Sequence, residues 1–165
     1  MSTGVDDELF RASPIDRSSP VPLYFQLAQQ LEAAINDGRF TLSSQSELGH
    51  SLRRSGAIDE ADAEYRQTIV GWQLSGNRGA VANQLESMAF TSIARDRGAR
   101  AAQLLGAAEA LRDMSGDPMT ADEHDEYDAE IERLRGLLDP EALRAAWAEG
   151  RAMSSAAAVA LALSE

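Results

Sequence analysis

Histidines, carboxylates and arginines are the side chains of this sequence that could support chemistry, and their spacing argues against a metal site. The two histidines, His50 and His124, lie far apart in the chain. His124 stands within the acidic run 122–126, but helical spacing places one carboxylate at most on its face, whereas a metal ion needs several converging ligands. We therefore expect no metal and interpret the run as a solvated helix start, where acidic side chains favour the helix dipole.

Neither paired carboxylates nor a nucleophile is indicated elsewhere. The acidic residues of 59–64 and 122–132 flank apolar positions, so we interpret them as exposed faces and not as general acids or bases. Ser154 and Ser155 have no histidine or glycine-framed elbow beside them, which favours a helix cap over a nucleophile. All fifteen basic residues are Arg, and without Lys the chain can form neither a Walker-type phosphate loop nor a Schiff base. The sequence predicts no catalytic residue, no cofactor and no enzyme.

Polar residues on helices are the remaining candidates for contact with a partner. Arg95, Arg97 and Arg100 form a basic cluster that could dock an anion or an acidic peptide. Such a cluster more often neutralises the C-terminal end of a helix, and we favour this interpretation. In a stacked helical repeat, the inner groove is lined by the first helix of each pair. The candidates on that groove are Gln45, His50, Gln84 and Ser87.

The composition is that of one soluble globular domain. The chain has 165 residues, of which 44% are hydrophobic and 25% charged, and no Cys for disulfides or thiolate zinc sites. The longest apolar run, residues 156–163, is shorter than the roughly 20 residues that cross a bilayer. Residues 1–8 have neither the basic start nor the apolar core of a signal peptide. We therefore expect a cytoplasmic protein that does not bind membranes.

The charge is unevenly distributed along the chain. The net charge is −12, and residues 117–165 hold twelve acidic residues against four Arg. An acidic surface repels the phosphate backbone of nucleic acids. We therefore expect no specific nucleic-acid partner.

The positions that carry these groups are predicted to be helical throughout. Glycines at 38, 56, 76, 98 and 116 each follow a stretch of apolar residues at helical spacing, where a C-terminal cap favours glycine. Asp59, the Thr120–Glu123 capping box, Asp139 before Pro140, and Ser155 are expected N-terminal caps. The predicted helices are 22–37, 41–55, 59–75, 78–97, 99–115, 121–138, 140–149 and 155–163.

An internal repeat relates these helices. Leu48, Gly49, Ala61 and Tyr65 correspond to residues forty positions later; these are Met88, Ala89, Ala101 and Leu105. Small residues let paired helices approach closely, and the larger ones fill the space between pairs. The predicted fold is all-α, with antiparallel helix pairs stacked as a tetratricopeptide-like right-handed superhelix.

The segment 46–66 resembles the tetratricopeptide motif, with Leu48-Gly49, Gly56 and Ala61 at its positions. A broader resemblance covers 41–165 and is strongest in Ala101-Ala102-Gln103-Leu104-Leu105-Gly106-Ala107-Ala108-Glu109-Ala110-Leu111-Arg112 and Ala146-Trp147-Ala148-Glu149-Gly150-Arg151-Ala152-Met153-Ser154. These runs look like the C-terminal tetratricopeptide-like region of large bacterial LuxR-type regulators with a signalling NTPase. This resemblance implies a protein-protein interaction module of a bacterial regulatory protein, which binds a peptide or protein through its helical-repeat surface.

The segment Ile15-Asp16-Arg17-Ser18-Ser19-Pro20-Val21-Pro22-Leu23-Tyr24-Phe25-Gln26-Leu27-Ala28, continuing to Gly38-Arg39-Phe40, resembles the start of a GntR-family repressor. That family binds DNA through a winged helix-turn-helix, of which this segment supplies the first helix. The recognition helix expected after Phe40 is missing, because the tetratricopeptide-like pattern begins there. The alternative function that this resemblance implies is a DNA-binding transcriptional regulator, as a remnant or a fusion.

Four parts of the chain are therefore expected. They are a flexible N-terminal segment at 1–20, a GntR-like helix at 21–40 acting as a cap, two tetratricopeptide-like repeats at 41–116, and an acidic helical cap at 117–165. Two repeats are fewer than the three that usually stabilise a stack. If an end face stays apolar and open, a homodimer would cover it.

Overall fold

The computed structural model describes residue 26, residues 39–116 and residues 118–164. By its internal contacts the chain divides into two units, residues 1–45 and 46–165, and the second holds nearly all of the described residues. The described ranges contain helices and no strand, which confirms the all-α fold class. Apart from residue 26, which is helical, the predicted helix 22–37 and the cap at Gly38 lie outside the described residues.

The helices of the described ranges begin and end within three residues of the predicted positions. They are α3 (Arg39–Arg54), α4 (Ile58–Ser75), α5 (Arg78–Ala94), α6 (Gly98–Ser115), α7 (Ala121–Leu137), α8 (Pro140–Arg151) and α9 (Ser155–Leu163). None of the helices in these ranges has the length and apolar character needed to cross a membrane.

Two of the predicted N-terminal caps are confirmed. The hydroxyl of Thr120 accepts the backbone N–H of Glu123, and the Glu123 carboxylate accepts the backbone N–H of Thr120 at 2.6 Å. Asp139 caps α8, with Pro140 in its first turn. The caps fix where these helices begin because each satisfies backbone N–H groups that have no partner within the helix.

The predictions for Asp59 and Ser155 are wrong in detail. The cap of α4 is Ala57, which makes no side-chain bond, and Asp59 lies inside the first turn. The cap of α9 is Ser154, whose hydroxyl accepts the backbone N–H of Ala157 at 3.1 Å. At α9 two adjacent serines compete for the cap, whereas α4 begins without a side-chain cap, so the sequence locates these helix starts only to within a residue or two.

The glycine caps are confirmed at Gly56, Gly76 and Gly116, which all adopt positive φ. The prediction for Gly98 is wrong, because the left-handed residue of that turn is Asp96, with φ of 57°. Gly98 is instead the buried first residue of α6. A Cβ atom there would lie 3.0 Å from Leu138 Cγ, so the lack of a side chain serves packing and not the turn.

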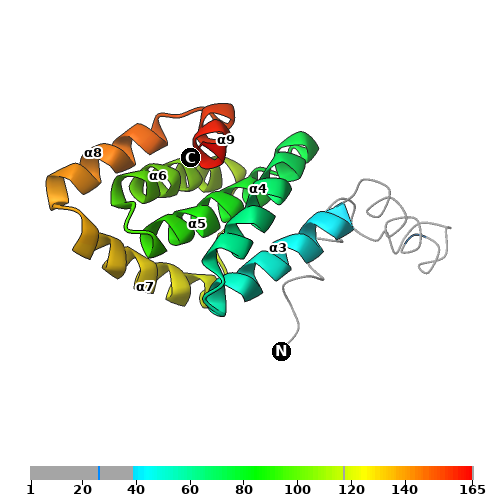
Figure 1. The fold of residues 1–165 in the computed structure, drawn as a ribbon. Helices are drawn as coiled ribbons and strands as arrows, with labels where there is room; N and C mark the ends of the chain where they lie inside the picture. The colour runs from blue at the N-terminus through cyan, green and yellow to red at the C-terminus, as the bar shows by residue number, and fades with distance from the viewer. Residues whose placement is uncertain (1–25, 27–38, 117, 165) are drawn as a thin grey trace. The chain divides into compact units, whose positions relative to one another are not determined.

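Helix α5 is the centre of the second unit. It contacts α4, α6, α7 and α9, and α6 in turn packs against α8 (Figure 1). All residues of α5 from Ala80 to Ile93 are buried except Asn83, so α5 has no solvent-facing side. A helix enclosed in this way needs its polar side chains bonded internally, and Thr68 of α4 meets one of them, Gln84, at 2.6 Å.

The residues of the internal repeat lie mostly in the core. Gly49, Ala61, Ala89 and Ala101 are buried, and their larger counterparts include the fully buried Tyr65. A Cβ atom at Gly49 would lie only 2.6 Å from Tyr65 Cε1, so glycine makes room for the ring. Leu48 departs from this pattern, since it is largely exposed and its counterpart Met88 is buried.

Helices α6 and α8 cross in close backbone contact. A Cβ atom at Gly106 would overlap the carbonyl oxygen of Trp147, and one at Gly150 would overlap the carbonyl oxygen of Gln103. The backbones therefore touch where each helix carries glycine. The two runs that carry the broader sequence resemblance, 101–112 and 146–154, form this crossing.

Candidate functional site

The predicted groove residues on α5 lie in the interior. Gln84 is 1% exposed and Ser87 is 3% exposed. Ser87 Oγ donates to the carbonyl of Asn83 at 3.0 Å, and Gln84 bonds the hydroxyl of Thr68. These two residues are not offered to a partner in this conformation, because α7 and the other neighbours of α5 enclose it.

His50 lies between Tyr65 of α4 and Ser87 of α5. Its Nδ1 atom is 3.1 Å from the Tyr65 hydroxyl and 3.4 Å from Ser87 Oγ. Burial lowers the pKa of His50 below its ordinary value. Because both hydroxyls meet the same ring nitrogen and Ser87 is buried, this arrangement orients a histidine and presents no nucleophile to solvent. Gln45 is half-buried in the other unit.

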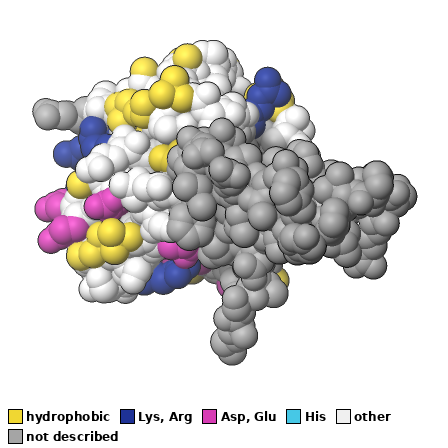
Figure 2. All heavy atoms as spheres, turned by 90° about the vertical axis from the view of Figure 1, so that its right-hand side faces the viewer, with side chains coloured by type: hydrophobic (Ala, Val, Ile, Leu, Met, Phe, Trp, Pro, Cys, Tyr) yellow, Lys and Arg dark blue, Asp and Glu magenta, His cyan; other side chains and the backbone are white. Residues whose placement is uncertain are grey.

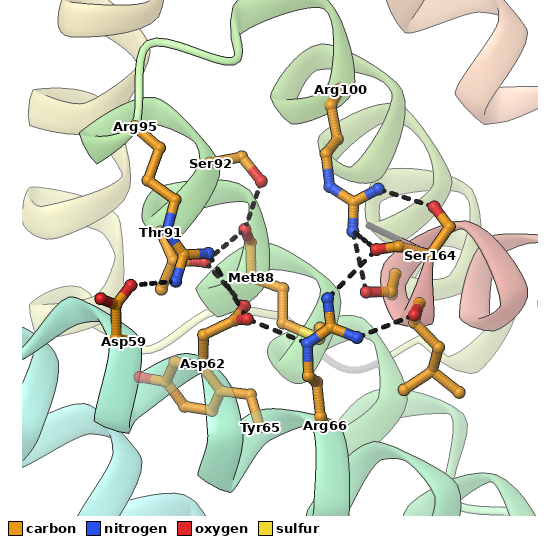
Figure 3. A network of polar contacts seen from close by, with 12 residues as sticks. Asp59, Asp62, Tyr65, Arg66, Met88, Thr91, Ser92, Arg95, Arg100 and Ser164 are labelled. Carbon is orange, nitrogen blue, oxygen red and sulfur yellow. Dashed lines mark hydrogen bonds and ion pairs between the residues drawn. The ribbon is translucent and has the colours of Figure 1, made fainter.

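The three predicted arginines do not form one anion site. Arg95 pairs with Asp59 at 2.6 Å and with Asp62 at 3.4 Å (Figure 3). Arg97 is exposed at the start of α6. Arg100 lies apart from Arg95 and reaches the end of α9 (Figure 3).

The C-terminal end of α9 is held by two arginines. Arg100 Nη2 donates to the carbonyls of Ala162 at 2.8 Å and Ser164 at 3.0 Å. Arg66 donates to the carbonyls of Leu163 at 2.7 Å and Ser164 at 3.1 Å (Figure 3). The last carbonyls of a helix have no internal partner, and its C-terminal end favours cations.

Of the three clustered arginines, Arg100 therefore neutralises a helix end. The helix is α9, however, and not the one that ends before Gly98. Arg66 was missed by the sequence analysis because its partners lie almost 100 positions away.

A second polar contact joins α7 to α3 and α5. Arg53 Nη2 donates to Glu126 Oε1 at 2.6 Å, and Arg54 lies 3.6 Å from the other oxygen of this carboxylate. The Arg53 guanidinium also lies over the ring of Phe90, 5.1 Å from its centroid. The side chain of Arg53 is 7% exposed, so this cation is held by an acid of α7 and an aromatic ring of α5.

The same side of α7 makes two further contacts with α5. Asn83 Nδ2 donates to Glu123 Oε1 at 3.1 Å. The ring of Tyr127 meets Phe90 edge to face, with centroids 6.3 Å apart. The side chains that receive α7 are termed here the α7-binding face, and they are Arg53, Arg54, Asn83 and Phe90.

Charge complementarity is strong at this face. Burial acts against ionisation of Glu126, but the hydrogen bond and charge of Arg53, with the charge of Arg54, hold the pKa of that carboxyl below its usual range. Burial, with the nearby Glu86 carboxylate, raises the pKa of Tyr127. Within the described ranges, Arg53 Nε is a buried side-chain nitrogen that has no hydrogen-bond partner.

Sequence reasoning missed the α7-binding face. The run 122–132 was interpreted as an exposed acidic face, which holds for Asp125 and Asp128 and not for Glu126. A usable signal was present, since Glu123, Glu126 and Tyr127 stand at helical spacing on one side of α7. In the described part of the chain, no group of three or more His, Asp or Glu side chains could hold a metal ion.

Exposed apolar side chains are dispersed on the face that Figure 2 shows, where separate hydrophobic groups alternate with arginines and acids. The large hydrophobic side chains most exposed among the described residues are Leu48, Val70, Leu74 and Met114. Comparison of this chain with protein-family models, with curated proteins and with solved structures gives no match.

Proposed function

We propose that this chain is a protein-protein interaction module that binds a peptide or protein partner through its helical-repeat surface. The observation that carries the proposal is the α7-binding face, where α3 and α5 hold a separate, largely polar helix through side-chain contacts. A surface that binds a helix of its own chain has the chemistry needed to bind a helix of another protein.

The finer architecture that we propose is a tetratricopeptide-like stack. In such a stack, α3 and α5 are the first helices of two successive pairs, α4 and α6 are the second, and the helices of 117–165 form a cap. The burial of Gly49 against Tyr65, and of Ala89 and Ala101 in the next pair, supports this arrangement, because repeat families place small residues where paired helices cross. The right-handed superhelical path is part of the proposal.

The biological setting that we propose is a cytoplasmic bacterial regulatory protein. The support comes from the resemblance of 41–165 to the helical regions of LuxR-type regulators. The two runs that carry this resemblance most strongly, 101–112 and 146–154, meet at Gly106 and Gly150. They form a close crossing of two helices, which suits a region built from packed helices.

The test is capture of a partner followed by measurement with pure proteins. The full chain is used as bait in extracts of the source organism, captured proteins are identified, and each candidate is purified and titrated against the chain by calorimetry. Arg54→Glu reverses a charge on the α7-binding face, and Arg135→Glu is the matched control, because their side chains are 61% and 60% exposed.

A one-to-one complex weakened about tenfold or more by Arg54→Glu and unchanged by Arg135→Glu is expected, which corresponds to roughly 1.4 kcal/mol. If no purified candidate binds, or if both substitutions have the same effect, the proposed surface is wrong.

A further inference from the structure

The way in which α7 is held resembles the binding of a helical ligand in a groove. Its polar and aromatic contacts with α3 and α5 come from Glu123, Glu126 and Tyr127, at positions i, i+3 and i+4, and the same stripe continues to Leu134 at i+11. The C-terminal end of α7 also packs against Gly98 of α6. This spacing is typical of an amphipathic helix that lays one side into a complementary surface.

Most of the remaining surface of α7 is solvated. Leu134 is the residue of its described part that is buried from solvent, and the other side chains described are exposed or half-buried. By contrast, α5 and α6 are buried along most of their length. A helix with so few buried apolar side chains opens at lower free-energy cost than the core helices.

We propose that the α7-binding face is a docking site for an acidic amphipathic helix of a partner protein, and that α7 occupies this site as an intramolecular ligand. This inference rests on the proposed function and specifies the chemistry of the partner. The partner helix presents two carboxylates and an aromatic ring at the spacing of Glu123, Glu126 and Tyr127, followed by an apolar residue near the place of Leu134.

The chemistry of the face selects an acidic helix. It offers the guanidinium groups of Arg53 and Arg54, the amide of Asn83 and the ring of Phe90. Guanidinium groups bind carboxylates through charge-assisted hydrogen bonds, and a basic helix would be repelled.

Competition with α7 determines how tightly a free helix binds. A tethered segment acts at an effective concentration in the millimolar range, so α7 reduces the apparent affinity of any competitor. The apparent dissociation constant is the intrinsic one divided by the fraction of molecules in which the face is free. Weakening the docking of α7 in the full chain should therefore tighten the binding of a helix added in trans.

The test uses a fluorescein-labelled peptide of residues 119–138 and the full chain. Fluorescence anisotropy compares the wild type with Glu123→Gln/Glu126→Gln, which weakens the docking of α7 and leaves the face intact. The control Asp125→Asn/Asp128→Asn makes the same change in charge on the exposed side of α7. Tyr127→Ala is a second releasing variant that leaves the charge unchanged.

Both releasing variants should bind the peptide at least about tenfold more tightly than the wild type, because the face is free in a larger fraction of molecules. The control should bind as the wild type does, and a peptide carrying both Glu→Gln changes should bind none of the proteins measurably. Hydrogen exchange in 121–137 should be faster in the releasing variants, with protection of α5 and α6 retained. That retention shows that the variants are folded.

Equal peptide affinity in all four proteins, or faster exchange without peptide binding, would overturn this inference. Because the peptide comes from the chain itself, the result does not depend on finding a natural partner. A natural partner that binds a chain unable to bind the peptide refutes the inference and leaves the proposed function standing. Peptide binding with no natural partner would show that α7 is a displaceable intramolecular ligand, and would refute both the proposed function and the partner that the inference assigns to the face.

Discussion

His50 connects the protonation state of the molecule to its stability. Burial lowers its pKa in the folded chain, while in the unfolded chain it titrates near the ordinary value of 6.5. As the pH falls through that value, the unfolded chain binds a proton more readily than the folded chain. Neutral His50 therefore does not reduce the stability of the fold well above pH 6.5, and the fold loses stability as the pH falls below that value.

The first prediction follows from this sign. Between pH 7.5 and 5.5, the free energy of unfolding should fall, and this fall should be smaller in His50→Gln than in the wild type. Urea denaturation followed by circular dichroism measures it. His124→Gln is the control, because that side chain is exposed on α7. A pH dependence that is the same in His50→Gln and in the wild type would contradict the prediction.

Residue type indicated which side chains are polar but not which of them reach solvent. Gln84 and Ser87 were predicted to line a groove because their helix opens the second repeat. The packing of α7 and α9 against that helix comes from segments far along the chain, and local periodicity does not report it. For Arg100 the prediction of a contact with a helix end was correct in kind, because the C-terminal end of any helix attracts cations. The sequence did not show that this end belongs to α9.

At the scale of elements, helix existence and length followed from the sequence. Periodic apolar residues and caps such as Thr120 and Asp139 are local signals, and the ends they predicted lie close to the observed ones. Gly98 shows where local reasoning fails. Its position after an apolar stretch indicated a turn, whereas its observed role is to let Leu138 approach α6 from 40 positions away.

The crossing of α6 and α8 supplies the second prediction. Gly150→Ala places a methyl group against the backbone of Gln103, which cannot shift without moving α6. Overpacking of this kind typically costs about 1–3 kcal/mol, and contact with backbone should put Gly150→Ala at the upper end of that range. Chemical denaturation of the full chain is the measurement.

Gly136→Ala on α7 is the matched control for this substitution. Nothing lies within 4 Å of a Cβ atom at Gly136. Alanine is a better helix former than glycine, so the control should stabilise α7 by roughly 0.5–1 kcal/mol. Equal effects of Gly150→Ala and Gly136→Ala would show that the close crossing does not limit stability.

At the scale of the whole molecule, several of the described arginines make internal contacts. Arg53 pairs with Glu126, Arg95 with Asp59 and Asp62, and Arg112 with Glu86. Arg66 and Arg100 bind the end of α9. The net charge is −12, and a cation committed to an acid or a helix end within the fold is not available to neutralise phosphate.

This distribution supports the last prediction, that the chain does not bind DNA specifically. Specific binding takes a recognition element in the major groove and commonly about six to ten phosphate contacts. The GntR-like segment lacks the recognition helix, and residues 1–40 hold three Arg against six acidic residues. The acidic 117–165 region adds repulsion, which is strongest at low salt, where electrostatic attraction would also be strongest.

Fluorescence anisotropy with labelled duplexes from the source genome, at about 50 mM salt, is the direct measurement. The expected result is no saturable binding below micromolar concentrations, and equal weak signals for genomic and scrambled duplexes. Mixed-sequence DNA with a basic protein of similar size confirms that the assay detects binding. Sub-micromolar binding that distinguishes one duplex from its scrambled control would refute the prediction. It would assign the GntR-like segment a working role.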